Sequence, residues 1–123
     1  MVLTLTSAHN LAIDLRQLGH VQAARELDED TLVRRRHIVG TDHFSTLTTA
    51  NNLAMDLREL GDVQAARELD EDTLARFRRV LGEDHPYTLR SASNLAMDLR
   101  ELGEAQAARE LDEDTLARRR RVL

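Results

Sequence analysis

Residues 52–81 read NLAMDLRELGDVQAARELDEDTLARFRRVL, and similar stretches occur two more times in the chain at a spacing of 42 residues. Between residues 53–81 and 95–123 only three positions differ. Self-similarity at a fixed period of a few tens of residues is typical of repeat proteins, in which one small unit is copied in series. The repeat therefore decides the fold class before the propensity of any single residue is considered.

The period divides the chain into three repeats, residues 1–42, 43–84 and 85–123. We expect them to form one repeat domain over residues 1–123. Repeats of this kind contact only their neighbours, and each covers apolar surface that the next one leaves open. We also expect the chain to be a fragment of a longer array.

The composition favours closely packed helices and offers little for catalysis or cofactor binding. Aromatic residues make up 2% of the chain and Trp is absent, so a core has to be built from Leu, Ala, Val and Met. Cys is absent as well, which excludes disulfides, thiolate metal sites and cysteine nucleophiles. We therefore expect no cofactor and no metal ion.

The formal net charge is −5, from 17 basic and 22 acidic residues. Because nucleic-acid binding depends on neutralising phosphates, this balance argues against a nucleic-acid partner. The sequence shows no signal peptide and no apolar run of about 18 residues, so we expect no membrane partner and a cytoplasmic location. All 17 basic residues are Arg, which is consistent with a GC-rich bacterial genome.

Two helices are predicted in each repeat, and the second repeat shows them best. Residues 46–60 carry apolar side chains at the i, i+3, i+4, i+7 spacing of one helical face. Gly61 follows, where a helix commonly ends in the left-handed region, and Asp62 then offers a carboxylate to the free amides of a second helix over residues 62–81. Because the connectors are short, successive helices have to lie antiparallel as a stack of hairpins.

The repeat resembles the tetratricopeptide repeat, in the long 42-residue form found in kinesin light chains and in bacterial multi-repeat proteins. The matching positions are Leu53, Ala54, Gly61 and Ala66, together with the connector Gly-Glu-Asp-His-Pro at residues 82–86. The resemblance implies an all-α fold, a right-handed superhelix (α-solenoid) of three antiparallel helix pairs. It also implies that the first helix of each pair lines a concave face, where this family holds an extended or helical peptide.

On this resemblance, the partner-binding residues are those that the first helices place on the concave face. They are Thr48, Asn51, Asn52, Met55, Arg58 and Glu59 in the second repeat, Arg16 in the first, and Arg90, Asn94, Met97 and Arg100 in the third. Two roles are open for Asn52, a hydrogen bond to the backbone of a bound peptide or one to the adjacent helix. The lining mixes Arg and Glu, so it does not form a uniformly basic clamp for an acidic tail.

Three polar positions depart from the pattern of the family. Asp56, Asp70 and Thr73 recur in all three repeats, at positions that the family makes at least partly buried. A carboxylate buried without a partner is costly, so it must be paired or hydrogen-bonded. We predict that Arg67, Arg78 or an Arg of a neighbouring repeat meets these groups, and that the resulting polar seams fix the stacking register. The alternative is that they are solvated charges on a wet helix edge.

No catalytic constellation appears in the sequence, so we do not expect an enzyme. His43 and His85 are equivalent connector residues, each next to an Asp, and we expect them to cap or brace the turn. Carboxylates are plentiful but recur in equal environments, whereas a general acid and a general base need unlike ones. The arginine runs at residues 34–36 and 118–121 end helices directly after acidic stretches, which favours solvated helix ends over phosphate contacts.

Two functions remain open at this point. The chain is either an interaction scaffold that binds a partner protein or peptide on the concave face, or a structural array that self-associates head to tail. The second hypothesis follows from the last helix, whose apolar side would face water where another repeat should pack. The residues expected to carry self-association are Leu111, Leu116, Val122 and Leu123.

Overall fold

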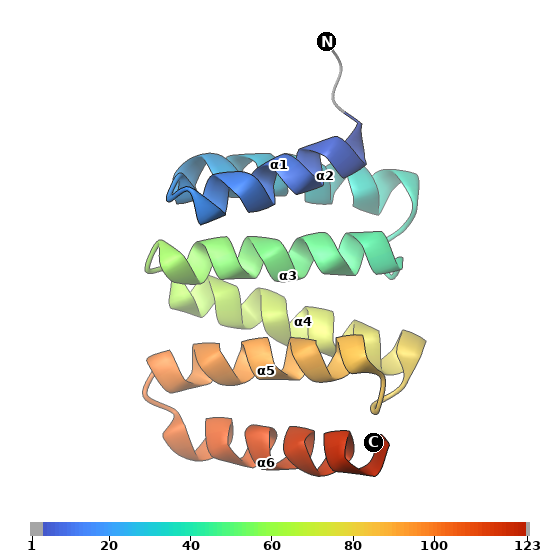
Figure 1. Cartoon of the computed structure of the whole chain (residues 1–123), viewed down its shortest axis with the longest axis vertical. Coiled ribbons are helices and arrows are strands. Elements are labelled where there is room, and N and C mark those ends of the chain that lie inside the picture. The colour runs from blue at the N-terminus through green and yellow to red at the C-terminus, as the bar shows by residue number, and fades with distance from the viewer. Residues whose placement is uncertain (1–3, 123) are drawn as a thin grey trace.

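The structure of the chain, a computed structural model, describes residues 4–122, and their side chains as far as residue 121. Within these residues it contains six helices and no strand (Figure 1). The helices are α1 (Leu5–Gln17), α2 (Val21–Ile38), α3 (Phe44–Glu59), α4 (Val63–Leu81), α5 (Pro86–Glu101) and α6 (Ala105–Val122). The expected all-α array of three antiparallel helix pairs is confirmed.

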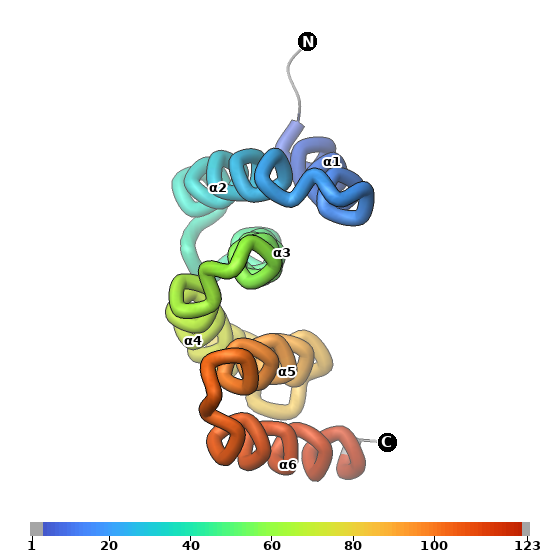
Figure 2. The backbone as a smooth tube through the Cα atoms, turned by 90° about the vertical axis from the view of Figure 1, so that its left-hand side faces the viewer, coloured from blue at the N-terminus to red at the C-terminus, as the bar shows by residue number. Residues whose placement is uncertain are grey.

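The helices stack in series as a curved column (Figure 2). Each helix packs on the helices before and after it in the chain, and the first helices of successive pairs also touch, α1 with α3 and α3 with α5. Figure 2 shows these first helices along the hollow side of the column. Their exposed side chains therefore share one surface.

The ends of the helices follow from capping side chains and from left-handed glycines. α3 begins at Phe44, two residues before the predicted start, because Nδ1 of His43 accepts a first-turn backbone N–H at 3.0 Å. His85 caps α5 in the same way, so the predicted capping role of the connector histidines is confirmed. Asp62 caps α4 as expected, and Gly61 turns the chain between α3 and α4 with a φ of +90°.

The core lies at the junctions between neighbouring helices. One cluster of buried side chains consists of Leu74, Ala92, Leu95, Ala96, Leu99 and Ala108, with Leu111 packed against it. A second cluster consists of Leu32, Ala50 and Leu53, with Leu57 and Leu69 packed against it. In both clusters a leucine of one second helix is covered by the first helix of the next pair, so each repeat shields its neighbour.

We expect the Leu53→Ala variant to be markedly less stable than the Leu11→Ala variant. The two leucines occupy the same position in successive repeats, but Leu53 is 7% exposed and Leu11 is 40% exposed. Truncating a buried leucine costs about 2–5 kcal/mol of unfolding free energy, whereas a surface truncation costs less than about 1 kcal/mol. Urea unfolding of dilute protein, followed by circular dichroism, measures both losses, and equal losses would contradict the packing described.

Candidate functional site

The first helices α3 and α5 border a cleft of about 280 Å³ on the hollow side of the column. Its lining residues are Arg16, Thr48, Asn51, Asn52, Met55, Phe77, Tyr87, Arg90 and Asn94. All of them except Phe77 and Tyr87 belong to the predicted partner-binding set. The structure therefore brings most of that set together around one cleft, with polar and apolar side chains side by side.

Contacts between repeats already engage four of the predicted side chains, Arg16, Asn51, Asn52 and Arg58. Arg58 is buried, with its Nη1 2.8 Å from Oδ1 of Asp98. Asn51 is also buried, and its Oδ1 accepts a hydrogen bond from the Ser91 hydroxyl at 3.3 Å. Three further predicted residues are exposed but do not line the cleft: Glu59, Met97 and Arg100.

Asn52 contacts the adjacent first helix. Its Nδ2 lies 3.5 Å from Nε2 of His9 on α1. Burial, and then the positive charges of Arg35 and Arg16, lower the pKa of His9, so its ring is neutral near pH 7 and can accept this hydrogen bond. Between the first two repeats, the geometry therefore favours the adjacent-helix role of Asn52.

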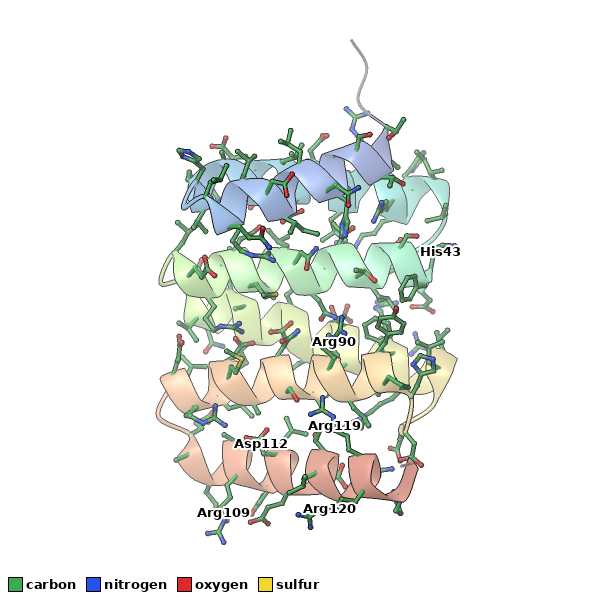
Figure 3. All side chains as sticks on the ribbon, in the orientation of Figure 1. His43, Arg90, Arg109, Asp112, Arg119 and Arg120 are labelled. Atoms are coloured by element: carbon green, nitrogen blue, oxygen red, sulfur yellow. The ribbon has the colours of Figure 1, made fainter. Side chains whose placement is uncertain are left out.

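The sequence pattern does not predict the aromatic cluster next to the cleft. The Tyr87 ring meets the Phe44 ring edge to face with centroids 4.7 Å apart, and it stacks on His85 with centroids 5.5 Å apart. The Arg90 guanidinium lies 5.6 Å from the centre of the Tyr87 ring, within cation–π range, and Figure 3 shows Arg90 projecting from α5 toward α3. Phe44 and Tyr87 remain 43% and 39% exposed. The only hint of this cluster in the sequence is that aromatic residues are rare, so the few that occur stand out.

Four carboxyl groups are fully buried at two junctions between repeats: Asp28 with Asp56, and Asp70 with Asp98. An arginine of the preceding repeat reaches one member of each pair. Nη1 of Arg16 lies 3.3 Å from Oδ1 of Asp56, and Arg58 holds Asp98 in the same way. The prediction that an Arg of a neighbouring repeat meets these carboxylates is confirmed, and the alternative of a wet helix edge is wrong for them.

Arg67 and Arg78, the other two predicted partners, do not contact the buried carboxylates. Arg67 binds Glu71 on its own helix and Glu104 at the start of α6, each at 2.7 Å. Arg78 is exposed. Of the three alternatives predicted as partners of the seams, the arginine of a neighbouring repeat is the one that the structure shows.

Each buried carboxyl pair holds one proton at neutral pH. With both members ionised, the oxygens of Asp28 and Asp70 have no hydrogen-bond donor. Burial raises the pKa of Asp28 to about 9, and its hydrogen bond to Asp56 and the charge of Asp56 add to the shift. Burial also raises the pKa of Asp70 to about 10, with the same two contributions from Asp98. The protonated member therefore donates to the carboxylate that the arginine holds.

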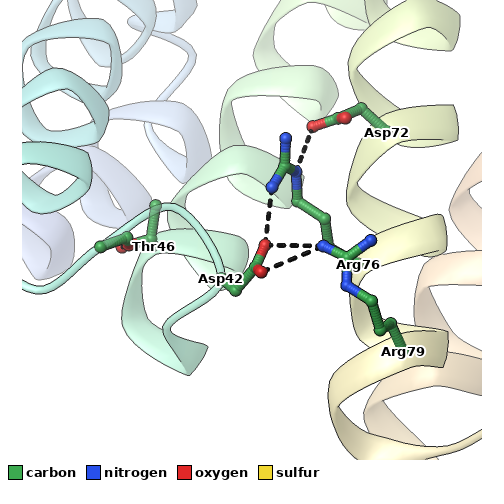
Figure 4. A network of polar contacts seen from close by, with 6 residues as sticks. Asp42, Thr46, Asp72, Arg76 and Arg79 are labelled. Atoms are coloured by element: carbon green, nitrogen blue, oxygen red, sulfur yellow. Dashed lines mark hydrogen bonds and ion pairs between the residues drawn. The ribbon is translucent and has the colours of Figure 1, made fainter.

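Exposed ion pairs brace the connectors between repeats. Figure 4 shows Asp42 between two arginines of α4, with 2.6 Å to Nη1 of Arg76 and 3.0 Å to Nη2 of Arg79. Hydrogen bonds from these guanidinium groups lower the pKa of Asp42. Asp84 makes the equivalent contact with Arg118 at 2.9 Å. Arginines near the ends of the second helices thus tie the connectors down.

The family profile of the tetratricopeptide repeat matches residues 3–75 and, in a second alignment, residues 45–121. The chain belongs to the tetratricopeptide repeat (TPR) family. Two crystal structures of a Podosopora anserina protein assigned as a kinesin light chain, with nearly identical TPR-like repeats, are similar to this TPR chain. Both are 34% identical to it over 97% of this chain and 56% of theirs, with TM-scores of 0.89 and 0.90.

A third solved structure shares the fold of the TPR chain. BtubC (BKLC) from P. vanneervenii is 23% identical, with a TM-score of 0.88 over 95% of this chain and 46% of that one. The TPR chain thus spans about half the length of these relatives. No curated protein sequence matches it. Proteins of this family generally mediate protein–protein interactions and are typically non-enzymatic.

Two structural absences hold for the described part of the TPR chain. None of its helices combines the length and the apolar character that crossing a membrane requires. Between residues 4 and 122, no group of three or more His, Cys, Asp or Glu side chains could hold a metal ion.

Because the buried carboxyl pairs hold protons, we expect their contribution to the stability of the TPR chain to fall as the pH rises. The folded chain binds protons on Asp28 and Asp70 that the unfolded chain has released, because their ordinary pKa of 3.8 is raised to about 9 and about 10. Proton binding by the pairs therefore contributes to the free energy of unfolding in full below pH 3.8. This contribution is lost as the pH rises from 3.8 to the raised pKa values of about 9 and about 10, with a slope of up to about 1.4 kcal/mol per pH unit for each pair. Urea unfolding between about pH 5 and about pH 8 measures the slope.

The Asp28→Asn/Asp70→Asn double variant isolates this effect, because an amide replaces the protonated carboxyl without a titrating group. We expect a flatter pH dependence and a folded state that is more stable than that of the parent chain at pH 8. Asp112→Asn is the matched control: it alters the same repeat position, but its side chain is 42% exposed. The control should keep the slope of the parent chain. A double variant with the parental slope would rule out the buried protons.

Proposed function

We propose that this TPR chain is a non-enzymatic interaction scaffold, and that the cleft between α3 and α5 holds a peptide of a partner protein. The observation that supports the proposal is the convergence of side chains from successive repeats on one hollow of about 280 Å³. Small-molecule sites usually enclose about 300–1,000 Å³, so this cleft suits one anchoring side chain of a longer peptide.

The lining of the cleft indicates the chemistry of that peptide. Arg90 is exposed, whereas the guanidinium of Arg16 is already paired with Asp56, and no acidic side chain is among the described lining residues. Met55 and Tyr87 add an apolar wall, and the Asn and Thr side chains can hydrogen-bond a peptide backbone. A peptide with an apolar anchor next to a carboxylate therefore fits best.

The proposed partner is a cytoplasmic protein or peptide. Nucleic acid and membrane surfaces are not proposed partners, because the net charge of −5 repels anionic surfaces. The same proposal needs no cofactor.

We expect Arg90→Glu to weaken the binding of such a peptide at least about tenfold, which corresponds to about 1.4 kcal/mol, because attraction for the peptide carboxylate becomes repulsion. Tyr87→Ala should weaken it as well, since it removes part of the apolar wall. A peptide array of acidic and apolar sequences supplies the ligands, and isothermal titration calorimetry measures their affinities for each variant.

Arg120→Glu is the matched control for the charge change. Figure 3 shows Arg120 projecting from α6 on the side away from α5, far from the cleft. This variant should bind the selected peptides like the parent chain. An array without hits, or hits that neither Arg90→Glu nor Tyr87→Ala weakens, would refute the proposed groove.

A second candidate function is a structural one, the head-to-tail self-association of chains. An exposed leucine on the last helix supports it, since Leu116 is 50% exposed. Leu111, also expected in this contact, instead packs against the inner core cluster. The side chain of Val122 and the whole of Leu123 lie outside the described residues.

A further inference from the structure

The face by which a first helix joins the preceding repeat is exposed on α1. In α3 this face carries three buried residues, Thr49, Leu53 and Asp56. One period earlier, α1 carries their equivalents, Ser7, Leu11 and Asp14, and all three are exposed. The start of the stack therefore presents the same joining face without a helix covering it in the described part of the chain.

The complementary face is exposed on the last repeat. At the junction with α5, three residues are buried: Arg58, Asp70 and Leu74. Their equivalents one period later are Arg100 and Asp112, with side chains 55% and 42% exposed, and Leu116, 50% exposed. These three line a shallow cleft of about 300 Å³ along α6. Among the described elements α6 packs only on α5, so this cleft corresponds to the seat that α5 occupies on α4.

The charges of the two exposed faces are complementary. Within the chain, an arginine of one first helix reaches the aspartate of the next first helix, as Arg58 reaches Asp98 at 2.8 Å. Arg100 holds the same position in the last repeat, but its Nη2 turns to Asp112 at 2.5 Å. The carboxylate of the matching position, Asp14, is exposed on α1.

A second set of donors and acceptors matches in the same register. Arg35 of α2 donates to the backbone carbonyl of Ser45 and to Oγ1 of Thr49, at 3.0 and 2.9 Å. Arg119 occupies the position of Arg35 in the last repeat and is exposed, and Ser7 presents a hydroxyl at the position of Thr49. The two ends therefore offer the hydrogen-bonding groups that the first internal junction uses.

We propose that α1 of a second copy docks head to tail in the α6 cleft, where its Asp14 takes the place beside Arg100 and Asp112 that Asp98 takes beside Arg58 and Asp70. The proposal rests on the second candidate function, self-association, and names the polar contacts that set its register. Leu11 of the docking copy covers Leu116, as Leu95 covers Leu74 inside the chain. Because the two faces differ, each added copy exposes a fresh cleft, and the contact extends without closing.

Sedimentation velocity over a wide range of concentrations tests the proposal on the 123-residue chain. We expect the parent chain to form a ladder of larger species as its concentration rises. Asp14→Arg and Arg100→Asp should each weaken association at least about tenfold, because each places like charges at the contact. The double variant Asp14→Arg/Arg100→Asp should restore it, since the swapped charges again attract between copies.

Glu110→Arg is the control for the change in net charge. Its position is exposed in all three repeats, as Glu26, Glu68 and Glu110, so it takes no part in a junction. The control should associate at least as well as the parent chain. Circular dichroism confirms that each variant is folded, which we expect because Asp14 and Arg100 are exposed.

The outcomes separate the proposal from the functions on which it draws. A parent chain that stays monomeric at every concentration overturns both self-association and this contact. If the chain associates and Asp14→Arg does not weaken the association, the proposed contact is wrong but self-association stands. Peptide binding in the α3–α5 cleft is measured independently, and its failure leaves the head-to-tail contact standing.

Discussion

The structure depends on the packing of each second helix against the first helix of the next repeat. The buried side chains at these junctions are small, because the chain has few aromatic residues and neighbouring repeats contact each other through Leu and Ala. Ala54 and Ala96 are fully buried on α3 and α5, where a small side chain lets the helices approach closely. In such an array the free energy of folding is approximately a sum over repeats and junctions, so no single centre holds the molecule together.

The buried carboxyl pairs fix the register in which neighbouring repeats stack. An apolar contact of Leu and Ala tolerates small slips, whereas a displaced Asp70 would lose both its hydrogen-bonding carboxylate and the nearby Arg58. In each pair one carboxyl group is protonated and the other is paired with an arginine. Two acidic residues can therefore be buried together although only one negative charge is compensated. The junctions differ where they face the hollow side: Arg35 stands at the first junction and Phe77 at the second, which gives the cleft part of its apolar wall.

Much of the fold can be predicted from the sequence, because the deciding signals are local. The 42-residue period gives the number of units, Gly61 and Asp62 mark a helix end and a helix start, and the histidines next to the connector aspartates cap the first helices. Phe44 begins α3 two residues earlier than the apolar spacing suggests, because capping by His43 sets the helix start and the apolar period does not contain that signal.

The partners of the polar residues are less predictable, since they come from other repeats. The sequence places Arg58 on the concave face, but its reach toward Asp98 depends on how far apart two stacked helices lie. The shared protons are equally hidden, because Asp28 and Asp56 look like ordinary acidic residues until burial brings them together. The Phe44–Tyr87 contact joins positions that are not equivalent in the repeat, so no periodic pattern contains it.

The interchangeable junctions also bear on how the length of such a protein can change. Every interface draws on the same positions of adjoining units, so the gain or loss of one complete unit leaves the shared Leu, Ala and Asp contacts of the remaining interfaces in place. Recombination between near-identical coding segments can therefore shorten or extend the gene in whole steps.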